Sequence, residues 1–141
     1  MKHLVLDASV VVKWALPMRD EEEHVEKALG ILLYIQDSRV VVHQPPHWLA
    51  EAAAVIERLS PATAKEDIKD LYEINFEIVD TREVYLKACE LSMELNHHLF
   101  DTLYHAVALL LQDTVLVTAD KKYFNKARSH GGILLLEDFG L

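Results

Sequence analysis

The sequence has almost no cysteine, and this scarcity limits how the fold can be held together. Among 141 residues only Cys89 carries a thiol, so the chain has neither a disulfide pair nor a set of cysteines for a structural zinc. Cys89 lies in an amphipathic pattern with Leu86, Leu91 and Met93. We therefore expect it to be a small, buried hydrophobic residue. A chain without disulfides is typical of the cytoplasm.

Glycine, proline and long apolar runs are also scarce. With four glycines and four prolines, the chain has few residues for turns and should be mostly regular secondary structure. No stretch approaches the roughly 18 apolar residues of a membrane-spanning helix, and the N-terminal segment is predicted to be a strand rather than a signal peptide. We expect a single domain over residues 1–141, with no membrane association and a cytoplasmic location,.

Basic residues are in the minority, with 14 Lys and Arg against 23 Asp and Glu and a formal net charge of −9. This balance excludes a protein that coats nucleic acid by bulk charge, because phosphate binding relies on Lys and Arg. It does not exclude a nuclease. Acidic clusters can hold metal cations, and the cations can then face a phosphate.

Hydrophobic patterns predict strands and helices that alternate along the chain. Leu4, Val5 and Leu6 are all apolar, so a strand formed by them would be apolar on both faces. This is expected for a central strand of a parallel sheet. We expect strands at 4–6, 39–43, 75–79, 114–118 and 133–136, and helices at 8–16, 19–38, 46–59, 60–72, 81–96, 100–112 and 120–129. This alternation predicts an α/β fold with a parallel sheet covered on both faces.

Local signals predict where several of these elements begin and end. The strand at 75–79 alternates polar and apolar residues, as a half-exposed edge strand does,. We expect Pro17 to end the first helix, the acidic run from Asp20 to Glu23 to form the first turn of the second, Ser60 to cap the fourth, and Asp80 with Glu83 to cap the fifth,.

Three aspartates are predicted to share one edge of the sheet. Asp7 and Asp120 directly follow strands, and the carboxyl ends of strands are where ligands bind in such sheets,. Asp101 starts a helix that leads into the fourth strand, so it begins at the same edge. Each aspartate alone can also be an ordinary helix cap. Asp80 has the same local context but follows the edge strand, so we expect it to be only a cap.

Glu51 is a fourth acidic residue that can reach this edge. It lies about one and a half turns into the helix at 46–59, within a run of small and apolar residues,. It is either on the exposed face of that helix or partly buried, in which case it needs a cation or hydrogen bonds. Carboxylates brought together repel each other, and a divalent cation removes that conflict. Oxygen ligands favour Mg²⁺ or Mn²⁺, which can activate water for phosphodiester hydrolysis.

Four segments that contain these acidic residues resemble the four conserved blocks of the PIN-domain family. They are Leu-Asp-Ala-Ser at 6–9, Leu-Ala-Glu-Ala-Ala-Ala-Val-Ile at 49–56, Phe-Asp-Thr-Leu-Tyr-His-Ala-Val-Ala at 100–108 and Val-Thr-Ala-Asp-Lys-Lys-Tyr-Phe at 117–124. The resemblance extends from Leu4 to about Leu136. The length of the chain makes it most similar to the VapC-type toxins of prokaryotic toxin–antitoxin pairs.

The resemblance implies a three-layer α/β/α sandwich with a central parallel five-stranded sheet in the order 3-2-1-4-5. It implies a metal-dependent endoribonuclease that uses Mg²⁺ or Mn²⁺ and is the toxin of a type II toxin–antitoxin pair. Two alternatives are a PIN nuclease of RNA processing or quality control and a non-catalytic PIN-fold interaction module. The implied partners are RNA, a cognate antitoxin and a second copy in a homodimer. The implied catalytic and metal-binding residues, here called the acidic quartet, are Asp7, Glu51, Asp101 and Asp120; the supporting residues are Ser9, Thr118 and Asn125.

Other residues have two open interpretations. Lys13, Lys121, Lys122, Lys126 and Arg128 follow the acidic residues and could bind RNA phosphates, or could form solvated helix faces. His105, four residues after Asp101, could contact the site or RNA, or could be a hydrogen-bonded core residue,. Trp14 and Trp48 could line a dimer or antitoxin groove, or could belong to the core.

Two departures from the family pattern affect the expected substrate more than the expected activity. Many relatives have Asn where this chain has Ala54, and Ser or Thr then Tyr where it has Leu99 and Phe100. Neither change removes a carboxylate. His97 and His98 are adjacent, so they cannot both face one site on a regular element, and we predict no zinc site there,.

Overall fold

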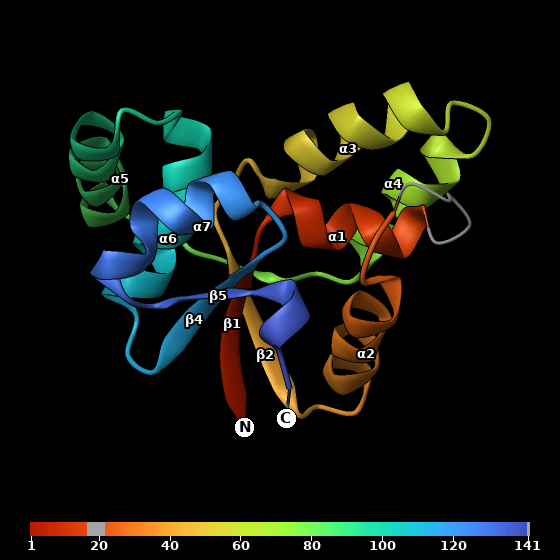
Figure 1. Cartoon of the computed structure of the whole chain (residues 1–141). Helices are drawn as coiled ribbons and strands as arrows, with labels where there is room; N and C mark the ends of the chain where they lie inside the picture. The colour runs from red at the N-terminus through yellow and green to blue at the C-terminus, as the bar shows by residue number, and fades with distance from the viewer. Residues whose placement is uncertain (17–21, 141) are drawn as a thin grey trace.

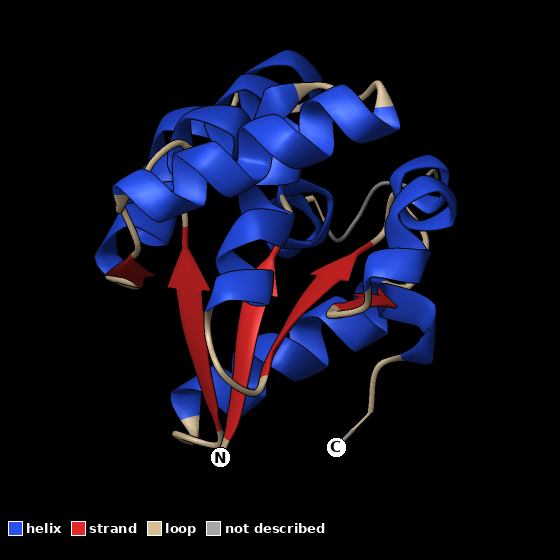
Figure 2. Cartoon of the chain, turned by 90° about the vertical axis from the view of Figure 1, so that its left-hand side faces the viewer, coloured by secondary structure: helices blue, strands red, loops and turns tan. Residues whose placement is uncertain are grey.

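The strands form one parallel sheet in the order that the resemblance implies. The structure is a computed structural model that describes residues 1–16 and 22–140. Its sheet has the order β3-β2-β1-β4-β5, and every neighbouring pair is parallel. The strands are β1 (Lys2–Leu6), β2 (Val40–Gln44), β3 (Glu77–Ile78), β4 (Thr114–Thr118) and β5 (Ile133–Leu135). In Figure 2 the arrowheads of the long strands point toward the same end of the molecule.

Helices cover both faces of the sheet, as the alternating pattern predicts. Figure 1 shows α5 and α6 on one side of the sheet and α1 and α2 on the other. On the second side α3 packs on α1, and α4 packs on α3. The α-helices are α1 (Ala8–Ala15), α2 (Val25–Gln36), α3 (Trp48–Leu59), α4 (Ala64–Glu73), α5 (Arg82–Leu95), α6 (Leu99–Leu110) and α7 (Lys121–Ala127); short 3₁₀ turns are η1 (Arg128–His130) and η2 (Leu136–Asp138).

The core lies on both faces of β1 and β4. Leu4, Val5 and Leu6 are all at most 2% exposed, which confirms that successive residues of β1 are buried on opposite faces. Burial of the apolar face of α6 adds to this core, because Leu103, Tyr104 and the residues up to Ala108 are buried. Asp7 and Asp120 follow the carboxyl ends of these buried strands.

Two predicted helix starts were wrong. The second helix begins at Val25, so Glu22 and Glu23 precede it and do not form its first turn. Instead Glu22 pairs with Lys13 and Glu23 with His24. Ser60 is the residue that ends α3, and the next helix begins after Thr63, whose hydroxyl donates to Asp67. The predictions for Pro17 and Asp20 fall outside the described residues.

Asp80 lies away from the site, as predicted, but it does not cap a helix. The N-cap of α5 is Thr81, whose hydroxyl accepts from the Val84 amide, while Asp80 is exposed and accepts a hydrogen bond from the Tyr85 hydroxyl. β3 pairs only with β2 and is therefore an edge strand. It is shorter than predicted because only Glu77 and Ile78 keep the pairing.

The expectations for Cys89 and the two tryptophans had different outcomes. Cys89 is exposed, because the buried face of α5 is formed by Val84, Ala88 and Leu91, and a neighbour of Ala88 is rotated off that face,. The core interpretation of Trp48 is confirmed, since it is 5% exposed and contacts the Phe76 ring. Trp14 is partly buried and its indole nitrogen donates to the Ala28 carbonyl. Among the described residues no helix is long and apolar enough to span a membrane.

Candidate metal centre

Asp7 connects the central strand to the first helix and to the neighbouring strand. It is the N-cap of α1, and its Oδ2 accepts from the amide and the hydroxyl of Ser9. The cap interpretation is thus confirmed, yet it does not exclude a second role. Leu6 lies in register with Val117, so the next pair along the two strands is Asp7 and Thr118. The Thr118 hydroxyl donates to the same Oδ2 at 3.2 Å.

The two hydroxyls also hold the segment that carries Asp120. The Ser9 hydroxyl accepts from the Ala119 amide at 3.0 Å, and the Thr118 hydroxyl accepts from the Asp120 amide at 3.1 Å. Asp120 is the N-cap of α7, where its Oδ1 accepts from the Tyr123 amide. Ser9 and Thr118 therefore fix Asp7 relative to Asp120, because each hydroxyl bonds to both segments.

Asp101 is in the first turn of α6, and not at its cap. His98 caps the helix by accepting from the Phe100 amide. Asp101 Oδ2 lies 2.9 Å from the imidazole Nε2 of His97. Ligand atoms of His97, Asp101 and Asp120 all lie within 4.8 Å of one another, a grouping that could hold a metal ion.

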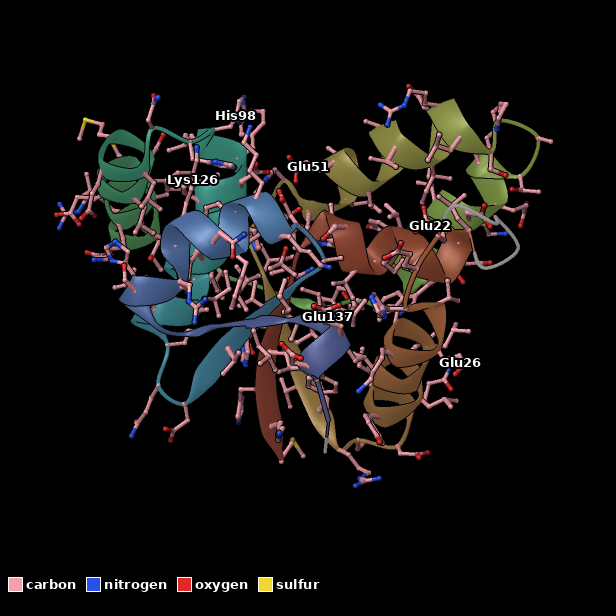
Figure 3. All side chains as sticks on the ribbon, viewed as in Figure 1. Glu22, Glu26, Glu51, His98, Lys126 and Glu137 are labelled. Atoms are coloured by element: carbon pink, nitrogen blue, oxygen red, sulfur yellow. The ribbon has the colours of Figure 1, made fainter. Side chains whose placement is uncertain are left out.

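Glu51 is partly buried in the first turn of α3, so the interpretation as an exposed helix residue is wrong. Its side chain is 24% exposed and its Oε1 accepts from the Tyr104 hydroxyl at 2.8 Å. His47 Nε2 lies 3.7 Å from the same oxygen and donates to the Phe100 carbonyl at 2.7 Å. Figure 3 labels Glu51 on α3, near the N-terminal end of α6 where His98 lies.

Burial and mutual repulsion raise the pKa values of two of the carboxylates. Burial raises the pKa of Asp7 from 3.8 to about 6; hydrogen bonds from Ser9 oppose the rise, and the charges of Asp101 and Asp120 add to it. Burial raises the pKa of Glu51 from 4.5 to about 7, against the hydrogen bond from Tyr104. Asp101 and Asp7 also raise the pKa of Glu51. Such coupling between acidic groups from distant parts of the sequence is typical of functional sites.

These side chains open onto one cleft beside α1, α3 and α6. The cleft has a volume of about 710 Å³ and is lined by three of the quartet, Asp7, Glu51 and Asp101. Its other lining residues are mainly apolar and include Ala54, Val55 and Phe100. Carboxylate oxygens are the donors that Mg²⁺ and Mn²⁺ prefer, and a cation would relieve the repulsion that adds to the effect of burial on the pKa values of Asp7 and Glu51. The donor set therefore fits the divalent ion that the family implies.

The sequence of residues 4–129 matches the family model of the PIN domain. The chain belongs to the PIN-domain family. Among solved structures, this PIN domain is similar to PAE2754 from Pyrobaculum aerophilum, with a TM-score of 0.65 and 19% identity over 96% of this chain and 90% of the other. It is also similar to DNA-bound VapBC from Salmonella typhimurium, with a TM-score of 0.61 and 17% identity over 96% of this chain and 97% of the other. No curated protein sequence matches it significantly.

Two residues proposed as RNA contacts of the PIN domain lie in the wrong place for that role. His105 is fully buried, with Nδ1 bonded to the Tyr123 hydroxyl and Nε2 to the Gly131 carbonyl. It is the hydrogen-bonded core residue of the alternative interpretation. Lys13 is 6% exposed and its ammonium pairs with Glu22 at 2.9 Å, so it has no free charge to offer a phosphate.

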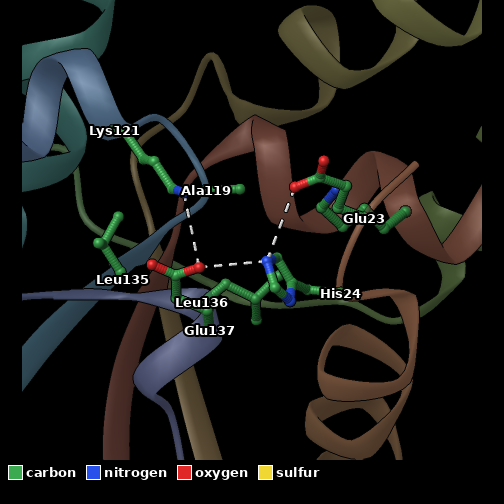
Figure 4. Close-up of a pocket in the computed structure, with 8 residues that line it drawn as sticks. Glu23, His24, Ala119, Lys121, Leu135, Leu136 and Glu137 are labelled. Carbon is green, nitrogen blue, oxygen red and sulfur yellow. Dashed lines mark ion pairs between the residues drawn. The ribbon is translucent and has the colours of Figure 1, made fainter. Parts of the chain in front are cut away.

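The remaining candidates on α7 are exposed. Lys121, Lys122 and Asn125 all lie at the surface of this helix. Figure 4 shows that Lys121 reaches Glu137, which also contacts His24. The Lys121 pair is 3.7 Å long and the lysine side chain is 62% exposed, so this contact leaves its charge accessible to solvent. Lys121 and Lys122 remain compatible with RNA binding, whereas Asn125 stays a prediction as a supporting residue of the site.

The contacts of three residues with the acidic quartet were not predicted from the sequence. The hydrogen bond from Tyr104 to Glu51 was not predicted, although the position of Tyr104 three residues after Asp101 on one helix was a usable signal,. His47 lies four residues before Glu51, which is again a helical spacing. His97 has the same spacing to Asp101 across a turn and a helix start, where no regular periodicity could be assumed.

Proposed function

We propose that this PIN domain is a cytoplasmic, metal-dependent endoribonuclease that hydrolyses RNA phosphodiester bonds, and that it is the toxin of a type II toxin–antitoxin pair. One observation carries the proposal. Carboxylates that are far apart in the sequence come together at the carboxyl edge of the sheet, where Asp7, Glu51 and Asp101 line one cleft and Asp120 adjoins Asp101. This is the arrangement that a metal-dependent nuclease needs.

The acidic quartet would hold Mg²⁺ or Mn²⁺. The bound ion would supply charge stabilisation at the phosphate and a more acidic water. Ser9 and Thr118 position Asp7 by donating to its Oδ2, which leaves Oδ1 for other partners. Tyr104 positions Glu51 by donating to Oε1. Without the ion, burial raises the pKa of Glu51 to about 7, so the ion would displace a proton from Glu51 when it binds near neutral pH.

RNA would approach across the cleft and the exposed face of α7. Lys121 and Lys122 follow Asp120 directly, so phosphates that flank the bound ion would pass close to them,. The similarity to the VapBC of Salmonella typhimurium supports an antitoxin as the partner, and the resemblance to VapC-type toxins implies a dimer. We therefore propose an antitoxin and a second copy of the chain as protein partners.

Cleavage of RNA by the purified protein tests the proposal. Labelled single-stranded and structured RNAs are incubated with Mg²⁺ or Mn²⁺, with EDTA, and with the Asp7→Asn variant. We expect cleavage only with the ion and the native carboxylate. Asp80→Asn is the matched control, because Asp80 also follows a strand but is exposed and remote from the quartet. Cleavage that persists in EDTA and in Asp7→Asn would contradict the proposal.

A further inference from the structure

His97 lies next to the proposed metal ligands and is held firmly in place. It occupies the turn between α5 and α6, where its amide donates to the Ser92 carbonyl and its carbonyl accepts from the Ser92 hydroxyl. Its side chain is 10% exposed. The imidazole packs edge to face on the Tyr123 ring, with the ring centroids 4.8 Å apart. These contacts restrict the ring to one orientation, in which Nε2 faces Asp101.

Lys126 determines which nitrogen of this imidazole carries the proton. Its ammonium lies 3.3 Å from His97 Nδ1 and 3.2 Å from the Asn96 carbonyl. Figure 3 labels Lys126 on α7, beside the N-terminal end of α6. A lysine ammonium has donors but no acceptor, so Nδ1 must accept and the proton of a neutral ring is on Nε2. The Nε2–H group then donates to Asp101 Oδ2 at 2.9 Å.

We propose that His97 is a positioning residue for the metal centre, which holds Asp101 through the chain Lys126–His97–Asp101 and is not itself a metal ligand. The hydrogen bond occupies Oδ2 and leaves Oδ1 of Asp101 for the cation. Hydrogen bonds from residues behind a metal ligand orient that ligand and raise affinity. The centre then keeps an all-oxygen donor set, which suits Mg²⁺ or Mn²⁺. This inference rests on the proposed function in requiring a divalent ion at the quartet.

Binding of the metal alone, measured by calorimetry with Mg²⁺, Mn²⁺ and Zn²⁺, tests the inference without RNA. His97→Leu removes the donor, whereas His97→Gln keeps an N–H at nearly the same distance from the backbone. We expect His97→Leu to weaken Mg²⁺ and Mn²⁺ binding about 10–100-fold, and His97→Gln to restore it largely. His130→Leu is the control, because His130 also pairs with a carboxylate, that of Glu94, outside the cluster.

The tautomer of His97 supplies a second readout that does not depend on the variants. Nitrogen NMR of the metal-free wild-type protein should show a protonated Nε2 and an unprotonated Nδ1. Lys126→Met should weaken this preference. A neutral ring in the wild-type protein with its single proton on Nδ1 would overturn the inference, because Asp101 would then have no donor from this ring.

The calorimetric outcomes separate this inference from the proposed function. If the wild-type protein binds Mg²⁺ and His97→Leu binds it equally well, only the positioning role of His97 is wrong. If His97→Gln is as weak as His97→Leu, and both lose Zn²⁺ affinity more than Mg²⁺ affinity, the imidazole is a ligand and the inference is again overturned. If the wild-type protein binds no divalent ion, both the inference and the metal mechanism fail.

Discussion

Replacing Asp7 by Asn should make the metal-free protein more stable. The change removes a partly buried charge that the neighbouring Asp101 and Asp120 repel. An Asn Oδ1 can take the place of Asp7 Oδ2 and still accept from Ser9 and Thr118. The substitution therefore retains the shape of the site and most of its hydrogen bonds, while the carboxylate that would bind the cation is lost.

The pKa of Asp7, which burial raises from 3.8 to about 6, determines how much stability Asp7→Asn gains and how that gain depends on pH. One pKa unit corresponds to about 1.36 kcal/mol, so ionised Asp7 lowers the free energy of unfolding by about 3 kcal/mol. Because the folded pKa is the higher one, the folded state binds the extra proton, and stability falls as pH rises from about 4 to about 6. The advantage of Asp7→Asn should be absent near pH 4 and complete above pH 7.

Urea unfolding of the two proteins in EDTA, at several values of pH, measures this difference. Asp80→Asn serves as the control because Asp80 is exposed, and we expect no comparable gain from it. Addition of Mg²⁺ should stabilise the wild-type protein more than the Asp7→Asn variant. The difference in free energy of unfolding between the two proteins should therefore become smaller. The electrostatic reasoning would be refuted if Asp7→Asn were no more stable than the wild-type protein at pH 8. It would also be refuted if the variant's gain in stability over wild type were as large at pH 4 as at pH 8.

Three further predictions follow from the same contacts. Protons compete with the cation for Asp7 and Glu51, so the apparent Kd for Mg²⁺ should fall as pH rises from 5.5 to 8, through the pKa values of about 6 and about 7; calorimetry that finds a pH-independent Kd would contradict this. Tyr104→Phe removes the hydrogen bond that lowers the pKa of Glu51, so it should weaken Mg²⁺ binding more at pH 6.5 than at pH 8. His105→Leu leaves buried groups of Tyr123 and Gly131 without partners and should cost about 2–4 kcal/mol in urea unfolding, with Mg²⁺ affinity retained if the histidine is structural.

The sheet could be predicted from the sequence because its strands are short, apolar runs that end at clear polar residues. Asp7 and Asp120 were predicted to share one edge of the sheet because each directly follows a strand and parallel strands end at one edge, and β1 and β4 are indeed parallel neighbours. The strand order itself came from the family resemblance, since local patterns do not specify which strands are neighbours. Helix boundaries were less certain, as at Thr63, where a turn precedes the helix that Ser60 was expected to begin.

The hydrogen-bonded surroundings of the carboxylates could not be predicted in the same way. His105 and Tyr104 lie on the same buried helix, yet one bonds within the core and the other reaches Glu51 on α3. The choice depends on tertiary packing, which residue spacing does not determine. Lys13 was misplaced for a related reason, because its ion pair with Glu22 depends on a tertiary contact that the spacing of the two residues does not specify.

Manganese located by anomalous diffraction tests the central claim most directly. Crystals of the wild-type protein and of Asp7→Asn are soaked in MnCl₂, and the anomalous signal is mapped at the carboxyl edge of the sheet. We predict a peak among the carboxylates of Asp7, Asp101 and Asp120 in the wild-type protein and its loss in Asp7→Asn. A wild-type protein with no peak at the quartet, or an equal peak in Asp7→Asn, would contradict the account.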